Sequence, residues 1–249
     1  MKKILVFFGI LLCAVNLYAE KISIFVASSA SKAMSEIKDE FIKTHPKDEV
    51  ELVFGASGKY YQLLKEGREF DLFFSADAKY ATEISKDGNA ISEPKVYALG
   101  VVALYALDDE LLEGGVKALG EKGEKIKHLS IANPKVAPYG EAAKQVLNHL
   151  KIYDSFKDKI VLGDNISQPV AYVDSGAAEV GIVAYSLVSA INHPKGKAVI
   201  IDEKLFEPLE QSFVITKYAK NKKLANEFAD FVSSARGKEI IKKYGFNTP

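Results

Sequence analysis

The sequence of 249 residues predicts an α/β protein made of two halves of similar size. In the first half, apolar segments at 21–27, 49–54 and 70–74 alternate with stretches whose apolar residues recur at helical spacing. This alternation predicts mainly parallel strands flanked by helices. A second unit of the same design follows from residue 128. The long apolar run 96–107 separates the two units and can carry the chain from one half into the other.

Each strand of the first half is expected to lead into a helix. Met34, Ile37 and Phe41 mark the first helix by their spacing. The second helix follows the turn Gly55-Ala56-Ser57-Gly58, and the third is capped by Asp77. Small and hydroxyl-bearing residues therefore stand at the start of these helices.

The second half repeats this plan. Strands are expected at 128–132, 159–162 and 181–185, and helices open at Pro138-Tyr139-Gly140 and after Ile166-Ser167. Strands at 197–201 and 212–216 and two helices then complete the chain. We expect one lobe from residues 20–98 and 210–249 and a second lobe from residues 99–209.

The first 19 residues have the features of a secretory signal peptide. Lys2 and Lys3 precede an apolar run, and Ala19 offers a small residue for cleavage. The run is too short to span a membrane. We therefore expect export to the periplasm, with Glu20 as the new N-terminus. A lipid anchor on Cys13 is the alternative, but Leu12 precedes it where a small residue is preferred.

Charge argues against a nucleic-acid partner. Removal of Lys2 and Lys3 lowers the count of Lys and Arg from 33 to 31 against 33 Asp and Glu, which leaves a net charge of −2. No basic run stands out. Cys13 is the one cysteine, so the processed chain would contain none and would depend on its core for stability.

Four helix starts are candidate anion contacts, two in each half. The first turn of a helix has unpaired N–H groups and a partial positive charge, so it can bind an anion without lysine or arginine. Any one of these serines is more often an ordinary helix cap. The coincidence of four, together with export, favours binding. The four starts are Ser28-Ser29, Ala56-Ser57, Tyr139-Gly140 and Ile166-Ser167.

Signals for an enzyme are weak. Ser29-Ala30-Ser31-Lys32 matches the S-x-x-K pattern, but Ser35-Glu36-Ile37-Lys38 matches it equally, and K-T-G and S-D-N do not occur. The four histidines lack metal-ligand spacing. We therefore predict a binding protein without catalytic residues or a cofactor. The alternative from another class is a secreted serine hydrolase that uses Ser29 and Lys32.

Six segments, in order along the chain, carry a resemblance to a known family. They are A-S-S-A-S-K-A-M at 27–34, F-G-A-S-G at 54–58, F-D-L-F-F-S-A-D at 70–77, A-N-P-K-V-A-P-Y-G-E-A-A-K at 132–144, G-I-V at 181–183 and G-K-E-I-I-K-K-Y-G-F at 237–246. With them the sequence resembles the periplasmic molybdate-binding proteins of ABC-type uptake systems over essentially the whole processed chain.

The resemblance implies the two-lobed periplasmic-binding-protein fold with an oxyanion in the cleft between the lobes. It implies contacts from the hydroxyls of Ser29 and Ser57, from the backbone amides at Tyr139 and Ile166, and from a tyrosine hydroxyl. The family's tyrosine directly follows G-I-V, where this chain has Ala184, so either Tyr185 or Tyr139 supplies the phenol. Any metal would be contacted only through the oxygens of the anion.

The expected function is capture of molybdate or tungstate by a monomer and delivery to a membrane permease. A site made only of donors suits a fully deprotonated dianion, and lobe closure would remove water from its hydrogen bonds. The alternative within the binding class is a receptor for sulfate or another tetrahedral oxyanion.

Overall fold

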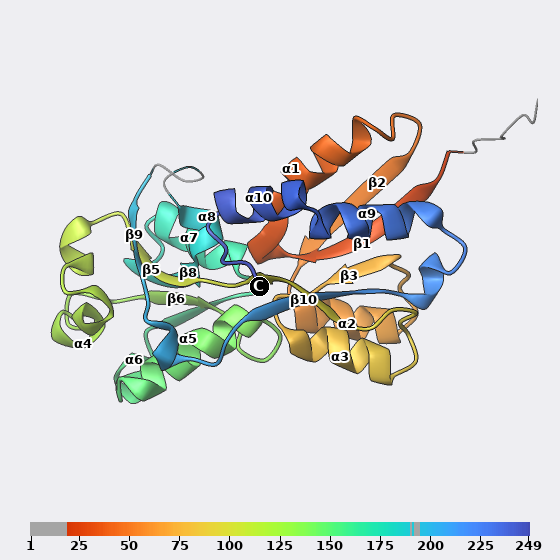
Figure 1. The fold of residues 1–249 in the computed structure, drawn as a ribbon. Coiled ribbons are helices and arrows are strands. Elements are labelled where there is room, and N and C mark those ends of the chain that lie inside the picture. The colour runs from red at the N-terminus through yellow and green to blue at the C-terminus, as the bar shows by residue number, and fades with distance from the viewer. Residues whose placement is uncertain (1–18, 190, 192–194) are drawn as a thin grey trace, which may run out of the picture.

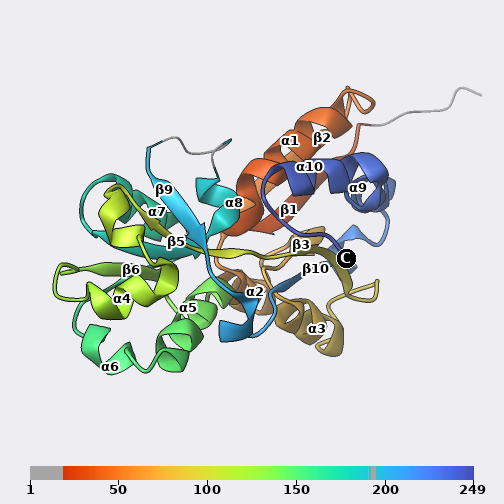
Figure 2. The same cartoon turned by 60° about the vertical axis from the view of Figure 1, so that its left-hand side comes forward.

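The computed structural model describes residues 19–189, 191 and 195–249. They form two lobes side by side, each built on one five-stranded sheet (Figures 1 and 2). Most of the predicted signal peptide, with the lipidation alternative Cys13, lies outside the described residues.

Lobe 1 has the strand order β2-β1-β3-β10-β4. Helices α1, α9 and α10 cover one face of this sheet and α2 and α3 cover the other (Figure 1). Its strands are β1 (Lys21–Ala27), β2 (Glu49–Gly55), β3 (Leu72–Phe74), β4 (Lys95–Leu99) and β10 (Glu210–Ile215). Its helices are α1 (Ser31–Ile42), α2 (Ser57–Lys65), α3 (Ala78–Lys86), α9 (Lys223–Ser233) and α10 (Ala235–Lys243).

Lobe 2 has the strand order β7-β6-β8-β5-β9 around a single apolar core. Its strands are β5 (Val102–Ala106), β6 (Leu129–Ala132), β7 (Ile160–Gly163), β8 (Val180–Ala184) and β9 (Lys197–Ile200). Its helices are α4 (Ala118–Glu121), α5 (Pro138–His149), α6 (Tyr153–Phe156), α7 (Ser167–Asp174) and α8 (Tyr185–Val188). Short 3-10 turns lie at Ser28–Ala30, Asp109–Leu112, Gly115–Lys117, Glu203–Leu205 and Lys217–Ala219.

Both sheets are mixed rather than mainly parallel. Each keeps a parallel trio, β2-β1-β3 or β7-β6-β8, and adds antiparallel pairs through β10 or β5. The chain crosses from one lobe to the other between β4 and β5 and again between β9 and β10. Each antiparallel strand pair includes at least one of these four strands. This arrangement supports the two lobes that we propose at 20–98 with 210–249 and at 99–209.

The apolar run 96–107 is two strands, not one. β4 ends at Leu99 in the first sheet and β5 begins at Val102 in the second. Gly100 stands at the break, where an added Cβ would lie 2.6 Å from the Tyr139 hydroxyl and 3.0 Å from Gln211 Nε2. A glycine here therefore lets the chain pass close to side chains of both lobes.

Glu20 connects the beginning of the described chain to its C-terminal helices. Its carboxylate accepts a hydrogen bond from the Leu224 N–H (2.9 Å) at the start of α9, a helix without a side-chain cap of its own. Its own N–H donates to the Asp48 carboxylate (2.8 Å). Residues from both ends of the sequence thus stabilise lobe 1.

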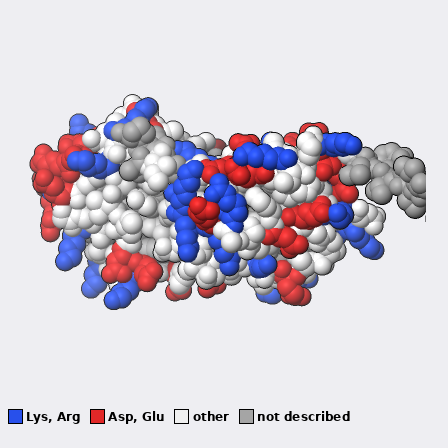
Figure 3. All heavy atoms as spheres, turned by 45° about the horizontal axis from the view of Figure 1, so that its top comes forward, with Lys and Arg blue, Asp and Glu red and all other residues white. Residues whose placement is uncertain are grey.

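Charges of both signs intermingle on the face that carries α1 and α10 (Figure 3). Basic side chains gather near its middle, but acidic side chains interrupt them. Within residues 19–189, 191 and 195–249, no helix combines the length and apolar character that a membrane crossing requires.

Candidate functional site

One small cavity lies where the two lobes meet. Its volume is ≈ 10 Å³, the space that about one water molecule needs, so the lobes close tightly over it. All of its lining residues are uncharged. From lobe 1 they are Ala27, Ser28, Ser29, Gly55, Ala56, Ser57 and Ala76, and from lobe 2 they are Ala137, Pro138, Tyr139 and Ile166.

Ser57 is the first residue of α2, immediately after β2 ends at Gly55. Its side chain is 1 % exposed, and its Oγ accepts a hydrogen bond from the Ala76 N–H (3.0 Å). A hydroxyl has one proton and two acceptor positions. Accepting this bond leaves the Ser57 hydroxyl able to donate its proton to a ligand in the cavity.

Ser28 and Ser29 follow β1 in a 3-10 turn that leads into α1. The N-cap of α1 is Ala30, which makes no side-chain hydrogen bond, so neither Ser28 nor Ser29 is the cap of this helix. The Ser28 hydroxyl donates to the Gly55 carbonyl (3.2 Å), and the Ser29 hydroxyl donates to Gln211 Oε1 (3.3 Å). Both distances exceed the usual range for O–H···O hydrogen bonds, so both bonds are weak.

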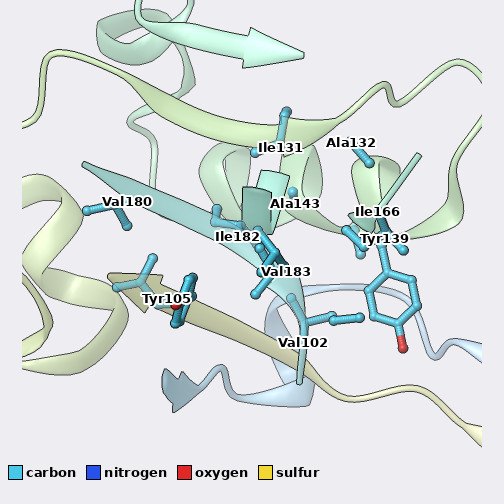
Figure 4. Packing of buried hydrophobic residues seen from close by; sticks show 14 of the residues in the cluster. Val102, Tyr105, Ile131, Ala132, Tyr139, Ala143, Ile166, Val180, Ile182 and Val183 are labelled. Carbon is cyan, nitrogen blue, oxygen red and sulfur yellow. The ribbon is translucent and has the colours of Figure 1, made fainter. Parts of the chain in front are cut away.

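Lobe 2 presents helix starts rather than hydroxyl-rich turns. Tyr139 follows Pro138 at the beginning of α5, and Ile166 is the N-cap of α7. The N–H groups at such positions have no partner within the helix, and they carry the positive end of its dipole. The side chains of Tyr139 and Ile166 lie side by side at one end of the lobe 2 core, with the phenol oxygen directed away from the labelled apolar residues (Figure 4).

Two glycines permit the close packing around the cavity. A Cβ on Gly58 would lie 2.4 Å from the Tyr80 hydroxyl and 2.9 Å from the Val136 carbonyl of the opposite lobe. A Cβ on Gly140 would lie 2.2 Å from the Ala132 carbonyl, at the end of β6. These positions set how near the lobes, and α5 and its strand, can approach.

Hydrogen bonds between described residues join the lobes beside the cavity. The Gly58 N–H donates to the Val136 carbonyl (2.8 Å), and the Ser186 hydroxyl donates to the Ser29 carbonyl (2.7 Å). Gln211 Nε2 donates to the Tyr139 hydroxyl (3.0 Å). The structure is therefore a closed arrangement, held by polar contacts beside the cavity.

Tyr185 is not among the residues that line the cavity. β8 ends at Ala184, and Tyr185 begins α8, where its N–H donates to the Val101 carbonyl (2.9 Å). Its ring lies against Gly245, whose added Cβ would be 2.8 Å from Tyr185 Cδ1. The other four predicted contact residues, Ser29, Ser57, Tyr139 and Ile166, all line the cavity.

Lys32 lines a different, open groove together with Ser31, Ser35, Ile191 and Tyr244. Burial lowers the pKa of the Lys32 ammonium, and the carboxylate of Asp174 raises it. Ser29 Oγ, by contrast, bonds to an amide oxygen. This geometry gives no support to a Ser29 and Lys32 nucleophile–base pair.

Tyr139 is the titratable residue that lines the cavity, and its hydroxyl keeps its proton near pH 7. Burial raises the pKa of the Tyr139 hydroxyl, and hydrogen bonds with Gln211 and Ser29 partly lower it. Burial likewise raises the pKa of Asp77, the N-cap of α3, against the hydrogen bond from Ser75. The part of the chain that the structure describes contains no cluster of three or more His, Cys, Asp or Glu side chains that could hold a metal ion.

Sequence reasoning missed Gln211, Ser186 and Val136. Gln211 is completely buried on β10, which begins at Glu210, whereas the predicted strand begins at residue 212 and leaves Gln211 out. A glutamine followed by the apolar run Phe213-Val214-Ile215 is the signal that could have drawn attention to it. Ser186 and Val136 each form a hydrogen bond with a backbone group of lobe 1. Such a contact between lobes has no sequence signature.

The chain matches the family model described as bacterial extracellular solute-binding protein over residues 22–247. It is 32% identical over 240 residues to the molybdate-binding protein ModA of Azotobacter vinelandii, which covers 96% of this chain and 93% of that protein. It is 34% identical over 204 residues to ModA of Rhodobacter capsulatus, covering 80% and 77%. The solved Azotobacter vinelandii periplasmic molybdate-binding protein superposes with a TM-score of 0.85 at 29% identity, covering 92% of this chain and 99% of that one.

Proposed function

Because the chain belongs to the ModA family of bacterial extracellular solute-binding proteins, we propose that it captures molybdate or tungstate for an ABC transporter. The members of this family are binding proteins, and this chain is not an enzyme. The family also places the protein outside the cytoplasm.

One observation carries the proposal: an uncharged interlobe cavity is surrounded by hydrogen-bond donors. Ser29 and Ser57 contribute hydroxyls from lobe 1, and Tyr139 and Ile166 contribute first-turn amides from lobe 2. Donors fixed in a water-excluded cavity stabilise an anion without a positive side chain. A tetrahedral oxyanion is larger than a water molecule, so the lobes part slightly to admit it and then close on its oxygens.

Tyr139 supplies the phenol in this proposal. It lines the cavity, and its hydroxyl lies beside Ser29. Tyr185 is the alternative phenol, and it would need α8 to turn toward the cavity. In this proposal Tyr139 reaches the anion without a rearrangement, whereas Tyr185 would reach it only after α8 moves.

Selectivity rests on protonation and size. Molybdate and tungstate are dianions at neutral pH, and donors alone satisfy them. Phosphate keeps a proton near pH 7, and that proton would face another donor. Sulfate has the right charge and shape but is smaller, so a cavity fitted to the larger ions would hold it through longer hydrogen bonds.

The transport role adds three further elements to the proposal. Residues 1–19 act as a signal peptide that directs the chain to the periplasm, with lipidation at Cys13 as the alternative. The processed chain acts as a monomer without a cofactor. It passes its ligand to the membrane permease of the transporter.

Calorimetric titration with molybdate, tungstate, sulfate and phosphate tests the proposal. We expect tight binding of molybdate and tungstate, weaker binding of sulfate and none of phosphate. Melting temperatures measured with the same ions should rise in the same order. Sulfate binding as tight as molybdate would overturn the size argument, and labelling of Ser29 by an acylating probe would favour the hydrolase.

A further inference from the structure

The buried side chain of Gln211 connects both lobes beside the cavity. It lies on β10 and is 0 % exposed. Its Oε1 accepts from the Tyr97 hydroxyl (2.9 Å) and the Ser29 hydroxyl (3.3 Å), and its Nε2 donates to the Tyr139 hydroxyl (3.0 Å). A single carboxamide thus contacts both hydroxyls that we place next to the anion.

The backbone around Gln211 is shaped to put this carboxamide there. The ladder between β10 and β4 shifts register between Gln211 and Ser212, which is an irregularity of the kind that redirects a side chain. Gly100 leaves room for the carboxamide and the phenol together, because an added Cβ would be 3.0 Å from Gln211 Nε2 and 2.6 Å from the Tyr139 oxygen. The site is thus built from three separate segments.

The hydrogen-bond directions around the carboxamide determine which protons are left for an anion. Tyr97 donates to Gln211 Oε1, and Gln211 Nε2 donates to the Tyr139 oxygen. Because the Tyr139 oxygen accepts from Nε2, the phenol proton must be donated elsewhere. Ser29 is the neighbouring hydroxyl, and the two share a hydrogen bond. With the amide donating to the Tyr139 oxygen, the Tyr139 proton can turn toward a bound anion, and the Ser29 proton can leave Gln211 Oε1, which still accepts from Tyr97, and turn toward the same anion.

We propose that Gln211 is a positioning residue that orients the Ser29 and Tyr139 hydroxyls as donors toward the oxyanion and forms its bond to Tyr139 as the lobes close. The inference rests on the proposed oxyanion binding. It adds a source of selectivity that the lining residues lack: the direction of the hydrogen bonds is fixed from behind the cavity by an amide with one donating and one accepting end.

The variant Gln211→Glu tests this direction. A buried carboxylate only accepts, so it would draw the Tyr139 and Ser29 protons away from the anion and also repel it. A buried carboxyl has a raised pKa, and its protonated form donates and accepts as an amide does. We expect molybdate affinity about tenfold or more below wild type at pH 8, with partial recovery at pH 6, measured by calorimetry.

Gln62→Glu is the matched control, because Gln62 is exposed on α2 and receives the same charge. We expect it and the wild type to bind molybdate equally at pH 8 and pH 6. Gln211→Met preserves volume but offers no donor and only a weak acceptor. We expect a loss of molybdate affinity that is the same at both pH values. Melting temperatures establish that each variant is folded, and Gln211→Met alone decides the matter if Gln211→Glu does not fold.

Two failures are distinguishable. If the wild type binds none of the four oxyanions, the proposed function fails. If the wild type binds molybdate but Gln211→Met binds as tightly, or if Gln211→Glu loses equal affinity at pH 8 and pH 6, the positioning role of Gln211 is overturned while the proposed function stands.

Discussion

Lobe 1 and lobe 2 line the same cavity with different chemical groups. Lobe 1 contributes the side-chain hydroxyls of Ser28, Ser29 and Ser57, whereas lobe 2 contributes the starts of α5 and α7, at Tyr139 and Ile166. A side-chain donor is removed by one substitution, but a backbone donor remains whatever the side chain. We therefore expect the two halves of the proposed site to tolerate sequence change differently, and the following variants test this expectation.

The largest effect is expected from loss of a lobe 1 hydroxyl. Ser57→Ala or Ser29→Ala removes a hydrogen bond to a charged ligand, worth about 1.5–3 kcal/mol, or roughly 10–150-fold in molybdate affinity. Calorimetry measures the change. Ser35→Ala is the matched control, since Ser35 does not line the cavity and its hydroxyl donates to the Ser31 carbonyl (2.8 Å). Equal losses in Ser35→Ala and Ser57→Ala would contradict the assignment of donors.

In lobe 2 the backbone can be tested through proline. Ile166→Pro removes the N–H, and the φ of −72° at this residue suits the proline ring. We expect roughly tenfold weaker molybdate binding, as for the loss of one charged hydrogen bond. Ile166→Val retains the amide and should change affinity less than about threefold, because volume-similar apolar exchanges cost little. Similar behaviour of the two variants would disprove the backbone contact.

How closely the lobes can approach each other should have a smaller, separate effect on molybdate affinity. Gly58→Ala would press a Cβ to 2.9 Å from the Val136 carbonyl of the opposite lobe and oppose closure. Overpacking costs about 1 kcal/mol at the low end, so we expect roughly fivefold weaker molybdate binding. Gly120→Ala serves as control, because its nearest neighbour would be 3.8 Å away. A Gly58→Ala variant with wild-type affinity would show that this contact does not limit closure.

Alkaline pH should have the least effect. Burial raises the pKa of the Tyr139 hydroxyl above its ordinary value of 10.0, so the phenol remains a donor up to that pH. The raised pKa contributes stability that is fully present below pH about 10 and is lost as the pH rises through the folded-state pKa. Molybdate affinity should be constant from pH 7 to about 10 in calorimetry. A decline with a midpoint near pH 8 would contradict the neutral, buried phenol.

Sequence patterns predicted the local elements better than the contacts between them. Ser29 and Ser57 could be placed at helix starts because a strand, a small turn and a helical repeat lie together within each short segment. Gln211 could not be assigned to the site, because it meets Ser29 across a separation of 182 residues. The break at Gly100 was missed for the same reason: the run around it is apolar, and only tertiary contacts with Tyr139 explain the glycine.

The family resemblance predicted what periodicity could not. Alternating strands and helices indicated two α/β halves, and four helix starts, two in each half, indicated an anion contact. The identity of the anion as a molybdate-like oxyanion and the individual contacts of Ser29, Ser57, Tyr139 and Ile166 came from the resemblance. The four residues line one cavity in the structure. The position of Tyr185 depended on where β8 ends, and a strand end is among the least predictable features of a sequence.

The placement of β10 has a consequence for the order of folding. β10 lies between β3 and β4, yet it comes from the last part of the sequence, whereas the strands of lobe 2 form one continuous stretch. Synthesis begins at the N-terminus, so lobe 2 can fold before β10 has been made, while β3 and β4 still have unpaired edges. Such edges are templates for pairing with other chains. A chain truncated before residue 210 should therefore aggregate. Pairing of β10 with β3 and β4 covers these edges and prevents them from pairing with other copies of the chain.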